Sequence, residues 1–319
     1  MPVLDLPLDQ LKTYQGRNPR PADIEAFWDR GLAELDRNDP RVTITPSPDR
    51  FAGAETFDLT FTGLGGAQVY AKFARPVRRE GKVPMLIRFH GYSMNSGDWF
   101  EHLAWVAQGY AVLAMDCRGQ GGRSHDNLAV KGWTLNGHFV RGIDEDSPDR
   151  LYYRNVFLDC AQIARIALAM PEVDPARLCV YGGSQGGALA IACAALEPRV
   201  AKLVTVYPFL SDYRRVWEMD LCKDAYLELN YWFRRFDPTH ARADAVFTRL
   251  GYVDIQWLAH RIKAKTLMFT GLMDPICPPS TQFAAYNKMT CPKEVVIYPD
   301  YAHEHLPGHL DRASQFFAG

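Results

Sequence analysis

A serine in a glycine-rich turn is the first residue whose type and surroundings could do chemistry. The pattern Gly-x-Ser-x-Gly runs from Gly182 to Gly186, with Ser184 at its centre. It follows residues 177–181, which are largely apolar after Arg177, and precedes residues 188–196, which are almost all Ala, Ile and Leu. A buried strand, a tight turn and a buried helix are expected there, the context typical of a nucleophile elbow. A glycine-rich turn with a serine cap is the alternative without chemistry.

A carboxylate and a base follow this serine in the chain. A serine hydroxyl is a poor nucleophile at neutral pH, and it needs a base that a carboxylate orients. Asp274 comes directly after the predicted strand 265–270, and His303 follows the predicted strand 294–298. The order Ser, Asp, His, with each residue after a strand, predicts a catalytic triad.

Two of these assignments have competitors in the sequence. Asp274 precedes a proline and could merely form a turn. His305 and His309 compete with His303, which we prefer because it lies nearest the end of its strand. A zinc-binding His-Glu-x-x-His helix would need histidine where Pro307 stands, so no metal is expected.

Acyl transfer also requires hydrogen-bond donors aimed at the negative charge that develops on oxygen. The backbone N–H of Gln185, directly after the serine, is the first candidate. The second is the backbone N–H of Tyr92, in a loop that also contains His90 and Gly91. His90 precedes the nucleophile in the chain, so we expect it to shape this loop and not to act as the base.

Composition limits the classes of function that the chain can have. Its 319 residues are 47% apolar, enough to fill a sizeable core, and its formal net charge is −1. This near-neutral charge implies neither a nucleic-acid partner nor an anionic membrane. Seven scattered cysteines indicate free thiols in a reducing compartment, and the first residues show no signal-peptide pattern. A cytoplasmic protein is therefore expected.

Apolar segments of strand length alternate with helical segments along most of the chain. A hairpin is expected over 55–62 and 68–73, and buried strands over 83–90, 109–116, 177–181, 200–207, 265–270 and 294–298. Helices are expected from about 21 to 39 and over 100–108, 151–170, 188–196, 278–289 and 306–317. This alternation predicts the α/β class, with a mainly parallel sheet covered by helices on both faces.

One internal segment departs from the alternation. Residues 211–261 are aromatic, charged and helical in character, so we expect a helical insertion or cap before Asp274. Residues 1–50 are expected to form an N-terminal arm and helix, with 1–20 irregular. We expect the whole chain, 1–319, to form a single domain.

Several motifs taken together resemble those of carbohydrate esterase family 7, the acetyl xylan esterases and cephalosporin-C deacetylases. The motifs are His90-Gly91-Tyr92, Arg118-Gly119-Gln120, Gly182 to Gly187, Gly271 to Asp274, and His303-Glu304. The resemblance covers essentially the whole chain and implies an α/β-hydrolase fold. It also implies that Arg118 and Gln120 give structural support beside the site, since a buried arginine must be paired.

The resemblance further implies an activity and an assembly. Such enzymes remove acetyl groups from oxygen on small sugars, xylo-oligosaccharides and cephalosporins, through an acetyl-enzyme intermediate and without a cofactor. Similar members are intracellular homohexamers whose active sites face an inner cavity. A deacetylase is therefore expected to act on small acetylated substrates.

Other functions remain alternatives. They are a general short-chain carboxylesterase, a peptidase of prolyl-oligopeptidase type, and a non-catalytic binding protein built on a hydrolase fold. Such peptidases usually carry a large N-terminal domain, for which the segment before the first strand is too short. Seven aromatic residues could line a sugar site or simply pack: Tyr207, Phe209, Tyr213, Trp217, Tyr226, Tyr231 and Trp232.

Overall fold

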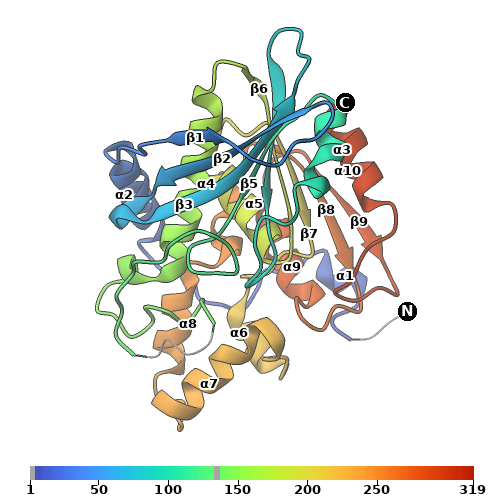
Figure 1. Cartoon of the computed structure of the whole chain (residues 1–319). Helices are drawn as coiled ribbons and strands as arrows, with labels where there is room; N and C mark the ends of the chain where they lie inside the picture. The colour runs from blue at the N-terminus through green and yellow to red at the C-terminus, as the bar shows by residue number, and fades with distance from the viewer. Residues whose placement is uncertain (1–3, 133–136) are drawn as a thin grey trace.

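A nine-stranded sheet forms the centre of the computed structural model, which describes residues 4–132 and 137–319 (Figure 1). The strand order is β1-β2-β3-β5-β4-β6-β7-β8-β9. The strands are β1 Thr43–Pro46, β2 Ala54–Thr62, β3 Gln68–Pro76, β4 Val83–Phe89, β5 Ala111–Met115, β6 Val173–Gly183, β7 Lys202–Val206, β8 Lys265–Gly271 and β9 Lys293–Tyr298. Strands β1, β2, β3 and β5 pair antiparallel, whereas all pairings from β5 through β4 to β9 are parallel.

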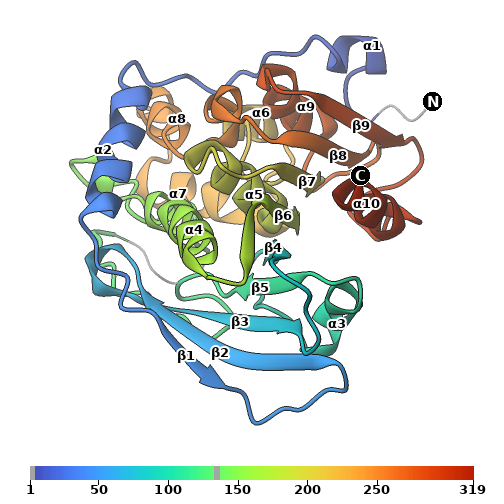
Figure 2. The ribbon, with the colours of Figure 1, turned by 90° about the horizontal axis from the view of Figure 1, so that it is seen from above.

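Helices cover both faces of the sheet, as Figure 2 shows in the view from above. The helices are α1 Leu8–Leu11, α2 Ile24–Asp36, α3 Phe100–Ala107, α4 Tyr152–Ala169, α5 Gln185–Leu196, α6 Tyr213–Glu218, α7 Leu227–Phe236, α8 Ala243–Gly251, α9 Pro279–Lys288 and α10 His309–Ala318. Helices α3 and α10 lie on one face, and α2, α4 and α5 lie on the other. Every residue of β5 and of α5 is buried, as the apolar sequences predict. Within the described residues, no helix is both long and apolar enough to cross a membrane.

The predicted α/β layers and the helical insertion are confirmed. Helices α6, α7 and α8, with short 3₁₀ turns, separate β7 from β8. The single-domain organisation over 1–319 stays a prediction.

Two short elements differ from the expectation. The predicted irregular arm, 1–20, contains the helix α1, whose Leu11 packs against Leu272 and Phe283. The edge strand β1 is missing from the prediction, because it has only four residues, all of them exposed, and ends at Pro46; the alternation of Val42 and Ile44 with threonines is too short to stand out.

The arm and the insertion are held together by one buried carboxylate, that of Asp212. Its Oδ1 accepts the backbone N–H groups of Arg17 at 2.9 Å and Asn18 at 2.7 Å. Its Oδ2 accepts the hydroxyl of Tyr14 at 2.8 Å. A segment near the N-terminus therefore fixes the start of the insertion almost 200 residues later in the chain.

Helix α5 approaches the sheet so closely that Gly186, in its first turn, has no room for a side chain. A Cβ atom added at Gly186 would lie 2.1 Å from the carbonyl oxygen of Phe89 in β4, and one added at Gly182 would lie 2.2 Å from the backbone of Gly186. The helix begins at Gln185, three residues before the predicted start, because these glycines allow the chain to turn directly into it.

Gly186→Ala should therefore force α5 away from β4. We expect the free energy of unfolding to fall by about 1–3 kcal/mol, the usual cost of overpacking a close contact. Chemical denaturation measures the loss. Gly183→Ala is the matched control, because its added Cβ would lie 3.5 Å from the Tyr207 ring, an ordinary contact. Equal stability of the two variants would contradict the packing argument.

Candidate active site

Ser184 lies in the turn between β6 and α5, and its backbone has a conformation that residues other than glycine rarely adopt. Its φ is 56° and its ψ is −121°. Hydrogen bonds from the neighbouring strand and loop hold this turn. The Ser184 N–H donates to the carbonyl of Val206 at 2.9 Å, and the Ser184 carbonyl accepts the N–H of Phe209 at 3.0 Å. The serine therefore stands at the N-terminus of α5, where the helix dipole favours negative charge.

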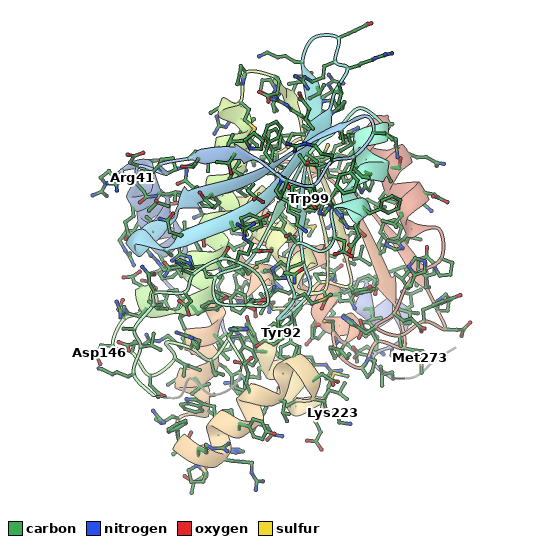
Figure 3. The ribbon with its side chains drawn as sticks, viewed as in Figure 1. Arg41, Tyr92, Trp99, Asp146, Lys223 and Met273 are labelled. Atoms are coloured by element: carbon green, nitrogen blue, oxygen red, sulfur yellow. The ribbon has the colours of Figure 1, made fainter. Side chains whose placement is uncertain are left out.

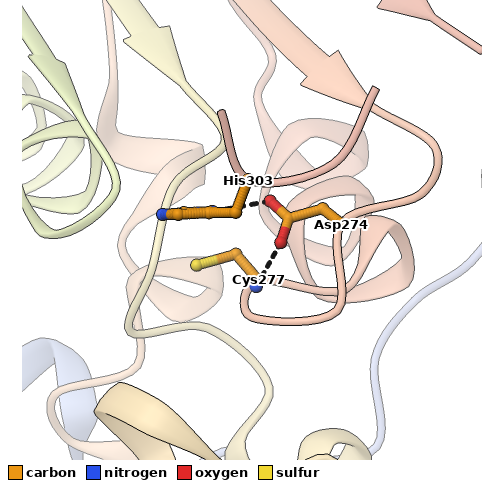
Figure 4. Close-up of side chains that lie close together, drawn as sticks. All are labelled: Asp274, Cys277 and His303. Atoms are coloured by element: carbon orange, nitrogen blue, oxygen red, sulfur yellow. Dashed lines mark hydrogen bonds and ion pairs between the residues drawn. The ribbon is translucent and has the colours of Figure 1, made fainter. Parts of the chain in front are cut away.

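His303 and Asp274 lie together at the ends of β9 and β8 (Figure 4). The imidazole Nδ1 lies 2.8 Å from Asp274 Oδ2, and its Nε2 points away from the carboxylate. Asp274 is fully buried, and its Oδ1 accepts the backbone N–H groups of Ile276 at 2.9 Å and Cys277 at 2.8 Å. Because both oxygens of the carboxylate are hydrogen-bonded, it can hold the imidazole in one orientation and tautomer.

One cavity of about 560 Å³ brings the serine and the histidine to a common surface. Ser184 and His303 both line it, together with Tyr92 and Ile276. Tyr207 also lines it, and its ring packs on the imidazole with centroids 4.4 Å apart. The volume lies in the range of sites for small molecules. The structure thus brings Ser184, Asp274 and His303 to one place, although they are spread over about 120 residues of the chain.

The two competing histidines, His305 and His309, do not line the cavity. His309 is buried, with Nδ1 on the carbonyl of Leu306 at 2.6 Å and Nε2 3.1 Å from the Tyr181 hydroxyl. His305 is exposed and its ring packs against that of His309. Of these three histidines, His303 is the one that lines the cavity beside Ser184.

His90 connects the loops that follow β4 and β5. Its Nδ1 donates to the carbonyl of Gly91 at 2.7 Å, and its Nε2 accepts the backbone N–H of Cys117 at 2.9 Å. Burial lowers the pKa of His90, so the ring is neutral. Because both ring nitrogens are engaged, this geometry suits the support of a loop and not proton transfer.

Tyr92 connects the β4 loop to the helical insertion. Figure 3 shows it close to the helices of that insertion. Its hydroxyl donates to the carboxyl of Glu228 on α7. Glu228 also accepts the N–H groups of His138 and Val140, each at 3.0 Å, and burial raises its pKa to about 7. No sequence motif marks Glu228, and only its contacts in the structure show its connection to the site.

Arg118 is paired, as the sequence requires of a buried arginine. Its guanidinium binds both oxygens of Asp159 on α4, with Nη2 2.7 Å from Oδ1, and both side chains are 1% exposed. Its Nη1 donates to the carbonyl of Leu64 at 2.9 Å. The pair joins the loop after β5 to α4, and the sequence indicates the need for a partner but not its identity. Gln120, two residues later, contacts the side chain of Gln185.

Most of the seven aromatic residues fill the core. Phe209, Tyr213 and Tyr226 are fully buried, and Trp232 is 2% exposed. Trp217 packs against phenylalanine and histidine rings. Tyr207 lines the 560 Å³ cavity, whereas Tyr231 lines a separate cavity of about 250 Å³. The helical insertion therefore presents few of its aromatic side chains to the site.

Asp274, Cys277 and His303 also form a group whose possible ligand atoms lie within 4.8 Å of one another. The hydrogen bonds of Asp274 and His303 already account for this closeness. Burial raises the pKa of the Cys277 thiol well above its usual range, and a neutral thiol is a weak metal ligand. We therefore assign no step to a metal at this site.

Comparisons with known proteins place this geometry in a family. The family model for acetyl xylan esterase (AXE1) matches residues 1–319. The crystal structure of acetyl xylan esterase 1 from Thermoanaerobacterium sp. JW/SL YS485 is 54% identical, with a TM-score of 0.96 and 98% of each chain covered. The acetyl xylan esterase from Paenibacillus sp. R4 is 38% identical, with a TM-score of 0.93, and 98% of this chain and 99% of that chain are covered.

A longer protein is also similar. Acetyl esterase Axe7A of Xylanibacter ruminicola is 27% identical over 301 residues, which cover 92% of this chain and 65% of that protein. The chain thus spans just under two thirds of the length of this relative. Together the matches confirm the predicted α/β-hydrolase fold, and the chain belongs to the acetyl xylan esterase family.

Proposed function

We propose that this chain is a serine esterase that removes O-acetyl groups from small acetylated sugars, such as acetylated xylo-oligosaccharides. One observation carries the proposal. The strained turn at Ser184 and the His303–Asp274 pair, with 2.8 Å between Nδ1 and Oδ2, meet at one cavity. Membership of the acetyl xylan esterase family supports the acetyl group as the acyl part. Cephalosporin C is a second possible substrate with an acetyl ester.

The proposed reaction runs in two halves. In the first, Ser184 Oγ attacks the acetyl carbonyl while His303 Nε2 accepts the serine proton and then donates it to the leaving alcohol. In the second, His303 takes a proton from water as the water attacks the acetyl-enzyme, and then gives this proton to Ser184 Oγ as the acyl–oxygen bond breaks and acetate leaves. Asp274 holds the imidazole throughout and stabilises its protonated form.

Negative charge on the carbonyl oxygen needs donors in both halves. The backbone N–H groups of Gln185, at the first position of α5, and of Tyr92, in the cavity wall, are the proposed donors. Gln185 begins a fully buried helix and the Tyr92 side chain is bonded to Glu228, so both N–H groups are held in place before charge develops.

Location and assembly are also proposals. A cytoplasmic location is supported by the seven cysteines, all free and six of them buried, which suit a reducing compartment. A homohexamer rests on the family resemblance alone. No cofactor, nucleic acid or membrane has a part in the proposed function.

Ser184→Ala should abolish turnover while leaving the fold intact. We expect kcat for p-nitrophenyl acetate to fall by roughly 10⁴- to 10⁶-fold, as in other triads. Ser314→Ala, at a half-buried position on α10 that does not line the cavity, is the control and should keep the parent rate. A Ser184→Ala variant with near-parent kcat would rule out the serine mechanism, and a parent protein without any acetate release would favour a binding role.

Asp274→Asn should keep the shape of the site and lose the orientation of the base. An amide that presents its NH₂ to His303 favours the wrong imidazole tautomer, so we expect kcat to fall by roughly 10⁴-fold. Steady-state kinetics with p-nitrophenyl acetate, after circular dichroism has verified folding, test this. A fall of less than about tenfold would mean that Asp274 only shapes its turn.

The length of the acyl chain that the site accepts separates a deacetylase from a general carboxylesterase. Tyr207, which packs on the His303 ring, and Ile276 both line the cavity, so we expect kcat/KM to fall by roughly 10- to 200-fold from p-nitrophenyl acetate to butyrate. The octanoate ester should react more slowly still. A flat or rising profile, still abolished by Ser184→Ala, would replace the deacetylase with a general esterase.

A further inference from the structure

Two glutamine side chains pair behind the proposed oxyanion donors. The Nε2 of Gln120 donates to Gln185 Oε1 at 2.8 Å, and the Nε2 of Gln185 donates back to Gln120 Oε1 at 3.0 Å. The same Gln120 Oε1 accepts the backbone N–H of Ser93 at 2.9 Å. Ser93 directly follows Tyr92, and Gln185 directly follows Ser184. The glutamine pair, Gln120 with Gln185, thus joins the two loops that carry the donors.

The direction of each amide follows from its neighbours. The Ser93 N–H can only donate, so it requires the oxygen of Gln120 to face the β4 loop. The Tyr153 hydroxyl lies 2.6 Å from Gln185 Oε1 and donates to it. Both amide oxygens and both amide nitrogens therefore have consistent roles, and the pair has one orientation.

The pair is also attached to a rigid helix. Gln120 Nε2 donates to the Tyr152 hydroxyl at 3.2 Å, and Tyr152 and Tyr153 are the first residues of α4. The Tyr152 hydroxyl in turn donates to the carbonyl of Arg118. Tyr152, Tyr153 and Gln185 are all buried, so few alternative partners are available to these groups.

We propose that Gln120 and the side chain of Gln185 are positioning residues that set the distance between the backbone N–H groups of Tyr92 and Gln185. This inference rests on the proposed function. The two donors come from loops almost 100 residues apart, and the pair bonds directly to both loops. Neither glutamine is among the residues that line the cavity within the described chain, so neither side chain is expected to touch substrate. If these donors are misplaced, the transition state loses more stabilisation than the ground state does.

The test compares an oxygen ester with its sulfur analogue. Sulfur accepts hydrogen bonds weakly, so a well-formed oxyanion site prefers p-nitrophenyl acetate to p-nitrophenyl thionoacetate. Gln120→Met and Gln185→Met keep side-chain length and remove the amides. For each we expect kcat with the oxygen ester to fall by about 10- to 100-fold and KM to change by less than about threefold. The preference for oxygen over sulfur should fall by about tenfold or more.

A matched control separates positioning from general destabilisation. Gln256, like Gln185, is fully buried; its side chain donates to Asp254, and it does not line the cavity. Gln256→Met should lower thermal stability and leave the preference for oxygen unchanged. If Gln120→Met does not fold, Gln120→Glu serves instead, because it keeps the acceptor for Ser93 and loses the donor to Gln185.

The outcomes distinguish this inference from the function on which it rests. An unchanged oxygen preference in folded variants of both glutamines, with Ser184→Ala inactive, would overturn the positioning role alone. An active Ser184→Ala variant would overturn the serine mechanism and, with it, the inference. A loss of preference in the glutamine variants but not in Gln256→Met would support the role.

Discussion

The left-handed turn at Ser184 is the constraint on which the rest of the structure depends. A non-glycine residue with φ of 56° persists only where its surroundings over-determine it. Here the Ser184 N–H donates to the Val206 carbonyl of β7 at 2.9 Å, and the Ser184 carbonyl accepts the N–H of Phe209 in the following loop at 3.0 Å. Gly186 lets α5 approach the end of β4. The backbone conformation of Ser184 therefore depends on contacts with the neighbouring strands of the sheet.

The same sheet explains why the other groups converge. Parallel strands present their carboxyl ends at one edge, so the loops after β4, β6, β8 and β9 meet there. Asp274 is fully buried at this edge, and backbone N–H groups and the imidazole compensate its desolvation. A charged group that costs free energy to bury is thus retained where it orients His303.

The helical insertion contributes to the walls of the site and not to its chemistry. Asp212 fixes its start to the N-terminal arm, and Glu228 binds the Tyr92 hydroxyl from α7. The protonation of Glu228, with a pKa near 7, changes the charge behind the β4 loop across the neutral range. The walls of the cavity and the loop that carries Tyr92 therefore belong to one connected part of the molecule.

The sequence by itself determined the strands β2 to β9, the helices that cover them, the insertion, the turn at Ser184 and the order of Ser184, Asp274 and His303. These follow from local periodicity and from motifs confined to a few residues. Only the tertiary structure decided the partners of the polar groups: Asp159 for Arg118, Glu228 for Tyr92, and Gln185 for Gln120. These pairs span 41, 136 and 65 residues, and no local pattern encodes which buried donor meets which acceptor across such separations. The exposed edge strand β1 escaped prediction because its pattern covers only four residues, and its pairing with β2 is what defines it as a strand.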